Sequence, residues 1–232
     1  MFLSKKLVTN IPVVVYERKG STSSQIQEDF VLSPGLYEIV CIGGGGGGAL
    51  ARGQSSTSTN RHWACGGVGG TVVVRVFVHR ITTTTISIAK SAQGNTGSFT
   101  GSGVTISGTN GNSSSIVGID NLTLTAGGGT GAIISSTSAV GANRTAGVIG
   151  SNIVNGSAIK DIRNNNNIRI ISGDGVLVAS GNAGQTSMNV VYANNINWPA
   201  DTTRGRGGSV GYPNGNGYNV PGNPGYVRIT KL

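Results

Sequence analysis

Hydrophobic and polar positions alternate most regularly over residues 71–79. Valine occupies every even position from 72 to 78, so these side chains share one side of an extended chain. A period of two carried by β-branched residues predicts a β-strand with one buried face.

Further short apolar segments separated by turn residues predict more strands. They span residues 11–16, 37–42, 82–88, 104–106, 116–117, 122–124, 168–171, 176–178, 188–192 and 225–230. Asp174-Gly175 favours a hairpin between two of them, because this dipeptide tolerates the positive φ of a tight turn. No segment shows a sustained period of 3.6 residues. The pattern predicts an all-β fold, in the form of a sandwich, jelly roll or barrel.

The predicted strand 37–42 leads directly into six consecutive glycines. They are Gly43, Gly44, Gly45, Gly46, Gly47 and Gly48. Ordering so many glycines costs conformational entropy, which a flexible linker would avoid by staying loose. The strands on both sides favour a rigid β scaffold, so we expect a structural role for this run.

Polar stretches separate the predicted strands elsewhere. Residues 17–28 are expected to form a polar connector, and residues 49–70 and 193–225 to form loops. The 232 residues suffice for one large β domain or two small ones. We divide the chain into an N-terminal strand and connector, 1–27, and a glycine-rich β domain, 28–232, which together form one continuous domain.

Composition and charge narrow the function classes. The chain has 40 glycines, only 11% charged residues and a net charge of +9. The basic residues are scattered, which is unlike the clustered tail or helix of a nucleic-acid binder. Such an excess favours approach to an anionic surface, or a place within a basic assembly. We expect no direct contact with nucleic acid.

The chain also lacks targeting signals. Residues 1–6 contain no apolar core of a secretory signal, and no run approaches the ~20 apolar residues of a membrane helix. We expect synthesis in a cytoplasm, no insertion into a membrane, and release by lysis or a specialised route if the protein works outside the cell.

The residues that could carry catalysis or bind a cofactor do not have the required spacing. The glycine run satisfies a dinucleotide-binding fingerprint trivially, but no helix pattern follows and no acidic residue occurs between Glu38 and Asp120. Carboxylates are scattered, and the four residues Cys41, His62, Cys65 and His79 match no zinc spacing. The sequence therefore predicts no enzyme, no cofactor and no metal site.

Three features together resemble a known family. They are the segment from Ser33 to Gly48, the segment from Leu124 to Gly129, and the closing segment from Gly222 to Ile229. Their order resembles the glycine-rich domains of bacteriophage tail fibres and related virion proteins. The resemblance implies a β structure at a fibre tip, located in the virion after synthesis in the host cytoplasm.

The same resemblance implies partners and an oligomeric state. Other virion proteins would hold the chain, and trimers are usual for fibres, although some adhesins of this type are single chains. Some members stack polyglycine II helices in layers. This chain has one long glycine run and one triple, so we expect a sandwich or jelly-roll-like domain with long glycine-rich loops instead of stacked layers.

The leading functional hypothesis is a tail-fibre tip or adhesin that binds a host surface glycan or outer-membrane protein. Aromatic and arginine side chains in loop-like contexts are the candidate receptor-binding residues. They are Arg52, Arg61, Trp63, Arg204, Arg206, Tyr212 and Tyr218. The aromatic residues have an alternative use as plugs of the β core.

Two other functions stay open at this point. The first is a purely structural subunit of a virion or filament, such as a capsid decoration or minor capsid protein. The second, which is weaker, is a glycan-cleaving enzyme that uses Asp174 or Asp201.

Overall fold

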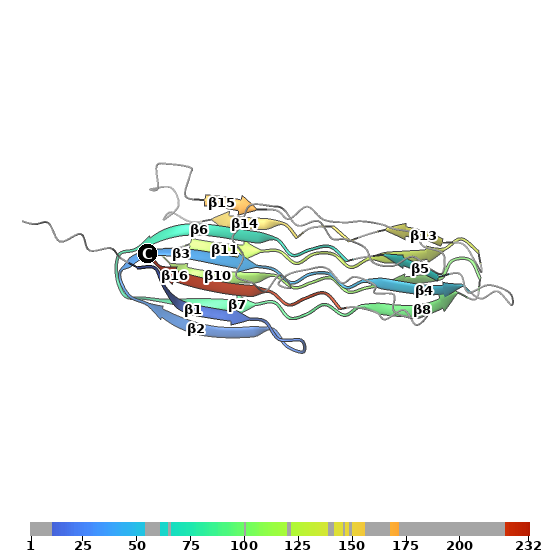
Figure 1. The fold of residues 1–232 in the computed structure, drawn as a ribbon, viewed down its shortest axis with the longest axis horizontal. Helices are drawn as coiled ribbons and strands as arrows, with labels where there is room; N and C mark the ends of the chain where they lie inside the picture. The colour runs from blue at the N-terminus through green and yellow to red at the C-terminus, as the bar shows by residue number, and fades with distance from the viewer. Residues whose placement is uncertain are drawn as a thin grey trace, which may run out of the picture.

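The protein is an elongated all-β body (Figure 1). The computed structural model describes residues 11–53, 61–64, 66–99, 101–119, 122–138, 142–145, 147–148, 150–155, 168–171 and 221–232. A large sandwich at one end, here called the base, is joined by straight glycine-rich segments to two small sheets at the other end, here called the tip. The predicted all-β sandwich is confirmed for the described residues, which contain no helix that could span a membrane.

Two five-stranded sheets form the base. The first has the order β1 (Val13–Lys19), β16 (Tyr226–Lys231), β3 (Gly35–Ile42), β6 (Thr71–Val78), β15 (Ile168–Ile171). The second has the order β14 (Asn152–Asn155), β11 (Leu122–Ala126), β10 (Ser114–Ile119), β7 (Thr82–Ile88), β2 (Ile26–Leu32). Every pairing within these sheets is antiparallel.

The core of the base lies between the two sheets. The alternating valines of β6 are fully buried, as their spacing predicts, and they pack with Ile39 of β3 and Ile229 of β16. Ile86 of β7 and Leu124 of β11 close the core from the second sheet. Alternation in β6 therefore identified a true core face.

The tip is a smaller sandwich. One sheet has the order β13 (Ala142–Thr145), β12 (Ile133–Ser136), β9 (Thr105–Ser107), and the other has the order β5 (Arg61–Ala64), β4 (Ala49–Gly53), β8 (Asn95–Phe99). Its core contains small alanines together with Phe99, Ile106 and Ile134. The loop expected at 49–70 is thus wrong over β4 and β5, because alternating alanines supply a buried face that large apolar residues usually signal.

The polar connector expected at 17–28 is also wrong in part, because β1 continues to Lys19 and β2 begins at Ile26. β2 buries alternate positions, with Leu32 fully buried and Ile26 and Phe30 packed against the base core. The strand spans residues 27 and 28, where the sequence suggested a division. β15 pairs with β6, while its expected hairpin partner 176–178 and the expected strand 188–192 lie outside the described residues.

Glycine-rich segments connect the base to the tip, and we call them the glycine bundle. They are residues 43–48, 66–70, 89–94, 108–113, 127–132, 147–148 with 150–151, and 221–225. Each adjoins a strand of the base, and the segments run side by side along the body (Figure 1). The sequence predicted glycine-rich loops here, whereas the structure has straight, hydrogen-bonded segments.

Residues 43–48 form the central segment of the bundle, and all six glycines are buried. Gly43 and Gly46 donate backbone hydrogen bonds to the segment 66–70, at 2.9 and 2.7 Å. Gly44 and Gly47 donate to 108–112, both at 2.9 Å, and Gly45 donates to Asn223 at 2.9 Å. The partner repeats every third residue, as in a left-handed helix with three residues per turn.

Glycine is required in the bundle because of close approach. A Cβ on Gly46 would lie 1.9 Å from the Thr130 carbonyl oxygen, and one on Gly69 would lie 2.1 Å from the Gly43 oxygen. A Cα hydrogen takes the place of that methyl group and points at the oxygen, which makes a Cα–H···O contact. Positive φ occurs only at Gly35, Gly103 and Gly118 among the described glycines, all outside the bundle.

Further closely approached glycines lie at 67, 127 and 129, and in most of the other segments of the bundle glycine recurs at every third residue. This spacing occurs at 66 and 69, 108 and 111, 128 and 131, 147 and 150, and 222 and 225. In 89–94, alanines at 89 and 92 take the equivalent places and accept hydrogen bonds from Gly225 and Gly222. Close packing of the bundle segments thus does not require several long glycine runs. The expectation that stacking would need them was wrong.

Candidate functional site

The structure brings three of the predicted receptor-binding residues together at the tip. Arg52 of β4 pairs directly opposite Arg61 of β5, and Leu50 pairs opposite Trp63. Alternation along each strand places Arg52, Arg61 and Trp63 on one face of this hairpin. The other predicted residues, Arg204, Arg206, Tyr212 and Tyr218, lie outside the described residues.

The alanines of the β4–β5 hairpin lie against the tip core. Ala49, Ala51 and Ala64 alternate with the residues named above and are buried in the tip core. Their small side chains let the two tip sheets approach closely, with Phe99 filling the space between them. Leu50, which alternates with these alanines and so lies on the other face of β4, is fully buried as well. Both faces of β4 are therefore covered around this residue.

β8 extends the same face. It pairs parallel with β4, so that Thr96 lies beside Leu50 and Ser98 beside Arg52. Both of these hydroxyl residues are exposed. The side of the β5-β4-β8 sheet on which Thr96 and Ser98 are exposed is here called the tip face.

His62 belongs to the opposite, inner face of the hairpin. Its ring contacts that of Phe99, with centroids 5.8 Å apart, and it is half-buried. His79 lies after the last residue of β6 at the base, where its ring makes an edge contact with Phe77 at 4.8 Å. The two histidines therefore lie at opposite ends of the body and cannot share a metal ion.

Cys41 lies in the core of the base, and its thiol is free. Burial raises the pKa of this thiol to about 12, although a hydrogen bond with the Ala126 backbone opposes the shift. A thiol that stays protonated at neutral pH and is shielded from solvent is chemically inert. Cys65 lies outside the described residues.

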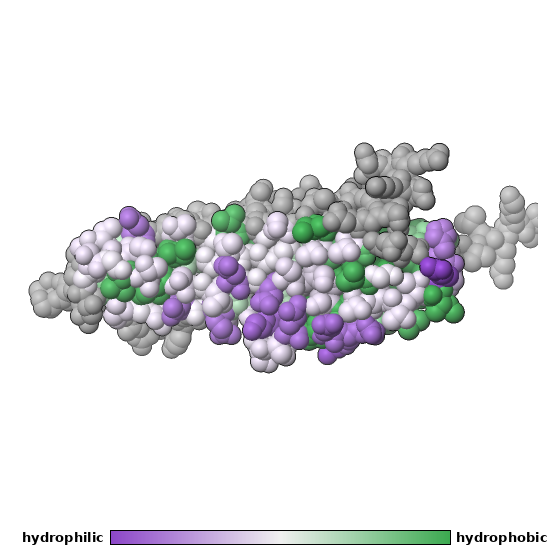
Figure 2. Space-filling view, turned by 180° about the vertical axis from the view of Figure 1, so that it is seen from behind, coloured by the Kyte–Doolittle hydropathy of each residue, from purple (hydrophilic) through white to green (hydrophobic). Residues whose placement is uncertain are grey.

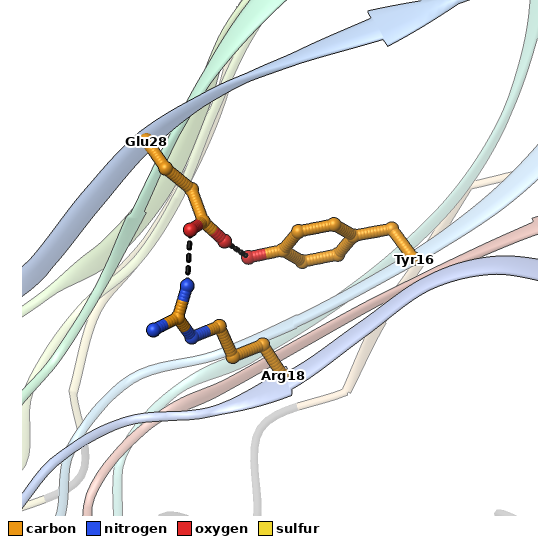
Figure 3. A network of polar contacts seen from close by, with 3 residues as sticks. All are labelled: Tyr16, Arg18 and Glu28. Carbon is orange, nitrogen blue, oxygen red and sulfur yellow. Dashed lines mark hydrogen bonds and ion pairs between the residues drawn. The ribbon is translucent and has the colours of Figure 1, made fainter.

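Two ion pairs link strands of the base. Glu28 accepts hydrogen bonds from the Tyr16 hydroxyl and from Arg18, which joins β1 to β2 across the two sheets (Figure 3). Burial, and then the hydrogen bond to Glu28, raise the pKa of Tyr16. Arg75 and Glu38 form a second ion pair at 3.1 Å. These groups stabilise the sandwich and show no geometry of a catalytic centre.

The strands of the tip differ from the strands of the base in their charged residues. Their sequences contain Arg52, Arg61 and Arg144 but no aspartate or glutamate. Sequence reasoning missed Arg144, which lies in β13, beside β5. The signal that could have found it is the absence of acidic residues between Asp120 and Asp161, together with the strand-forming context of residues 142–145.

Exposed apolar residues gather at the end of the base that is farthest from the tip. Leu36 and Phe77 are cross-strand neighbours there and are 40% and 50% exposed. Ile11, Val13 and Ile81 are exposed at the same end. Figure 2 shows hydrophobic surface at the right-hand end of the body, next to hydrophilic residues.

Comparison with known proteins identifies the family. The family model described as a glycine-rich domain matches residues 22–230, which include all the segments of the bundle. No match to a curated protein was found. The match covers most of the chain, so the protein belongs to the glycine-rich domain family.

Proposed function

We propose that this protein is a non-catalytic attachment module, the tip of a virion fibre or an adhesin. It binds a glycan or an outer-membrane protein on the host cell through its tip. It would be made in the host cytoplasm and incorporated in the virion beside other virion proteins. The resemblance to tail-fibre domains supports the virion setting.

The observation that carries the proposal is the rigid separation of base and tip. Backbone groups in the bundle contact other backbone groups directly, so the segments cannot slide or bend without breaking many hydrogen bonds at once. Such a body displays two small sheets at a fixed distance from the sandwich. Binding residues on loops and strands positioned by a rigid scaffold are typical of recognition modules.

A second candidate function is a structural subunit of a virion or filament. The exposed apolar residues at the end of the base favour it, because contiguous exposed apolar surface marks sites of protein contact. Contacts there could join copies into a homo-oligomer, including the trimer expected for fibres, or join the chain to another virion protein. The two functions are compatible if the base assembles and the tip binds.

Shielding each end of the body separates these functions. A polyethylene glycol chain is attached through Ser98→Cys on the tip face or Thr83→Cys at the base, both exposed positions, in a Cys65→Ser background. Cys41 does not react because it is buried. Binding to susceptible cells is measured by flow cytometry, and self-association by sedimentation.

We expect polyethylene glycol at Ser98→Cys to reduce cell binding at least about tenfold, because the large polymer blocks the tip face. We expect polyethylene glycol at Thr83→Cys to leave cell binding intact. Dissociation of oligomers by the base shield alone would support the structural role. Failure of the unshielded protein to bind any susceptible strain, or full binding with the tip shielded, would contradict attachment through the tip.

A further inference from the structure

The two outer faces of the base sandwich differ in charge. On the first sheet, Glu17 of β1 lies directly opposite Arg228 of β16, and Glu38 of β3 lies directly opposite Arg75 of β6. These residues alternate with the core residues of their strands, so they belong to the outer face. The five strands of the second sheet, in contrast, contain no lysine and no arginine.

The outer face of the second sheet consists mainly of small hydroxyl residues, and we call it the hydroxyl face. Its positions alternate with buried residues such as Ile86 of β7 and Leu124 of β11. The strand register brings six hydroxyl side chains together there, in adjacent strands β7, β10 and β11. They are Thr83, Thr85, Ser87, Ser115, Thr123 and Thr125.

One charged group lies on the hydroxyl face, and it has a partner within the face. Asp29 of β2 pairs opposite Thr85 of β7, and the Thr85 hydroxyl donates a hydrogen bond to its carboxylate at 2.8 Å. The neighbouring Glu28 alternates to the other side of β2, where it accepts from Tyr16 and Arg18. The strands of this face therefore offer no cation to an anionic glycan or a nucleic acid.

Aliphatic side chains are exposed on the same face. Val31 of β2, Val117 of β10 and Ile153 of β14 are 59%, 40% and 48% exposed. Val117 lies in the middle strand of the sheet, directly between Thr85 and Thr123. Soluble surfaces usually intersperse many charged residues, whereas the centres of protein interfaces are depleted of them. The hydroxyl face thus has the composition of an interface.

We infer that the hydroxyl face packs against the hydroxyl face of a second copy, which gives a dimer with two-fold symmetry. A hydroxyl group both donates and accepts hydrogen bonds, so two identical faces of serine and threonine can satisfy one another. A chain with a net charge of +9 repels a copy of itself, and a face without cations is where two copies can meet. Two-fold contacts use the same surface on both partners.

The size of the face sets the strength of the dimer. Its strands are four to seven residues long. Strands about 4.8 Å apart with a rise of about 3.3 Å per residue give a face of roughly 24 by 20 Å, so two copies would bury about 1,000 Å². Specific interfaces begin near this area, so we expect a reversible dimer with a Kd on the order of 1–100 µM.

Sedimentation equilibrium of the full chain tests the inference, over concentrations on the order of 1 to 300 µM that span the expected Kd. The parent chain should approach twice the chain mass of 23.4 kDa as its concentration rises. The main variant is Val117→Lys, at the centre of the hydroxyl face. Leu36→Lys is the matched control, because Leu36 is also 40% exposed and adds the same charge on the outer face of the first sheet.

We expect Val117→Lys to weaken dimerisation at least about tenfold, because each copy would bring an unpaired charge into the centre of the contact. We expect Leu36→Lys to change the Kd less than about twofold. Equal weakening by both lysines would contradict the inference. A loss with Leu36→Lys alone would assign the contact to the apolar end of the base.

Two further variants separate the effect of charge from an effect on folding. Val117→Thr keeps a β-branched side chain and adds a hydroxyl, so it should leave the Kd within about threefold of the parent value. Thr123→Lys, directly opposite Val117 on β11, should weaken the dimer as Val117→Lys does. Thermal unfolding followed by circular dichroism confirms that each variant is folded, and a folded Thr123→Lys that dimerises like the parent chain would overturn the inference.

Salt provides a readout with a distinctive sign. Raising the salt concentration from about 0.05 to 0.5 M screens the repulsion between two basic chains, so the dimer should become tighter. Association through ion pairs would weaken under the same change and would overturn the inference. A monomer throughout the concentration range would overturn it too, as would a trimer, because a face that packs on itself closes at two copies.

This inference is independent of what the tip binds, and the two proposals fail differently. Flow cytometry of the Val117→Lys variant measures cell binding without the dimer. If the parent chain is monomeric and binds susceptible cells, the attachment function stands and the dimer is wrong. If the parent chain forms the dimer and binds no cells, the dimer stands and attachment is wrong.

Discussion

β3 and the glycine segment that follows it are one continuous stretch of chain that is stabilised in two different ways. In the base, Tyr37, Ile39 and Cys41 insert side chains into a shared core. In residues 43–48 there is no side chain to insert, and backbone meets backbone instead. The chain thus continues straight from a region that is stabilised by buried side chains into a region whose close packing requires that side chains be absent.

The difference shows in how each region responds to a change in volume. Removing atoms from the base core leaves a cavity and loses apolar burial, which is worth roughly 1.5–3 kcal/mol for a whole aliphatic side chain. Adding atoms to the bundle forces apart backbones that are already hydrogen-bonded to one another. The bundle gains little from hydrophobic burial, so its stability depends on many hydrogen bonds of modest net value.

The largest effect is expected from Gly46→Ala. The added methyl group would lie 1.9 Å from the Thr130 carbonyl oxygen and 2.4 Å from its carbon, and both belong to backbone that cannot rotate away. We expect a loss of more than about 3 kcal/mol in the free energy of unfolding, above the usual range for overpacking because the obstacle is main chain. Urea denaturation followed by circular dichroism measures it.

Gly101→Ala is the matched control for this substitution. Nothing lies within 4 Å of a Cβ at Gly101, which follows β8 at the tip, and its φ is not positive. We expect no loss, and a gain of up to about 1 kcal/mol from reduced entropy of the unfolded chain. Equal stabilities of the two alanine variants would show that close approach is not what selects glycine in the bundle.

How far the sequence predicts this contrast depends on the region. The even valines of β6 identified a buried face, because alternation is a direct consequence of strand geometry. The six glycines were expected to be held by a β scaffold, and they are buried at the centre of the bundle. In both places a local pattern carries enough information.

The tip and the outer segments of the bundle were much harder to predict. β4 and β5 have small inner residues such as Ala51 and Ala64, so hydrophobicity alone does not show their buried face. Outer segments repeat glycine every third residue, a period that a search for strands and helices does not test. Pairing of Arg52 with Arg61 depends on register, which no local pattern specifies.

A smaller effect is expected from alkaline pH, and it acts on the base. Burial raises the pKa of the Cys41 thiol from an ordinary value of 9.0 to about 12. Above pH 9 the unfolded chain releases this proton while the folded chain keeps it, so stability is full below pH 9 and falls between pH 9 and 12. At pH 10 we expect a loss of about 1.4 kcal/mol relative to pH 7 from this group.

Cys41→Ala removes that contribution and serves as the test. The variant is less stable at neutral pH because it loses buried volume, so the comparison is the change in unfolding free energy between pH 7 and pH 10. Tyr16, whose pKa burial also raises, contributes in the same direction in both proteins and cancels. An identical pH dependence in variant and parent chain would show that Cys41 titrates in the folded state as it does when unfolded.

The smallest effect, from Val148→Ala, sharpens the contrast within the bundle itself. Val148 lies between Gly147 and Gly150 in an outer segment, and it is 65% exposed. Its backbone donates to the Thr130 hydroxyl and accepts from the Thr130 amide, contacts that alanine keeps. We expect a change within about 0.5 kcal/mol, typical of surface positions, measured by the same urea denaturation.

Gly147→Ala, one residue earlier, is the comparison that gives this small value its meaning. A Cβ at Gly147 would lie 2.0 Å from the Thr130 carbonyl oxygen and 2.1 Å from the Gly67 nitrogen. A large loss there beside a negligible one at Val148 would establish that the limit on side chains applies position by position along the segment. Similar losses of unfolding free energy at both positions would contradict this, because the exposed side chain of Val148 would then contribute as much to stability as the closely approached Gly147.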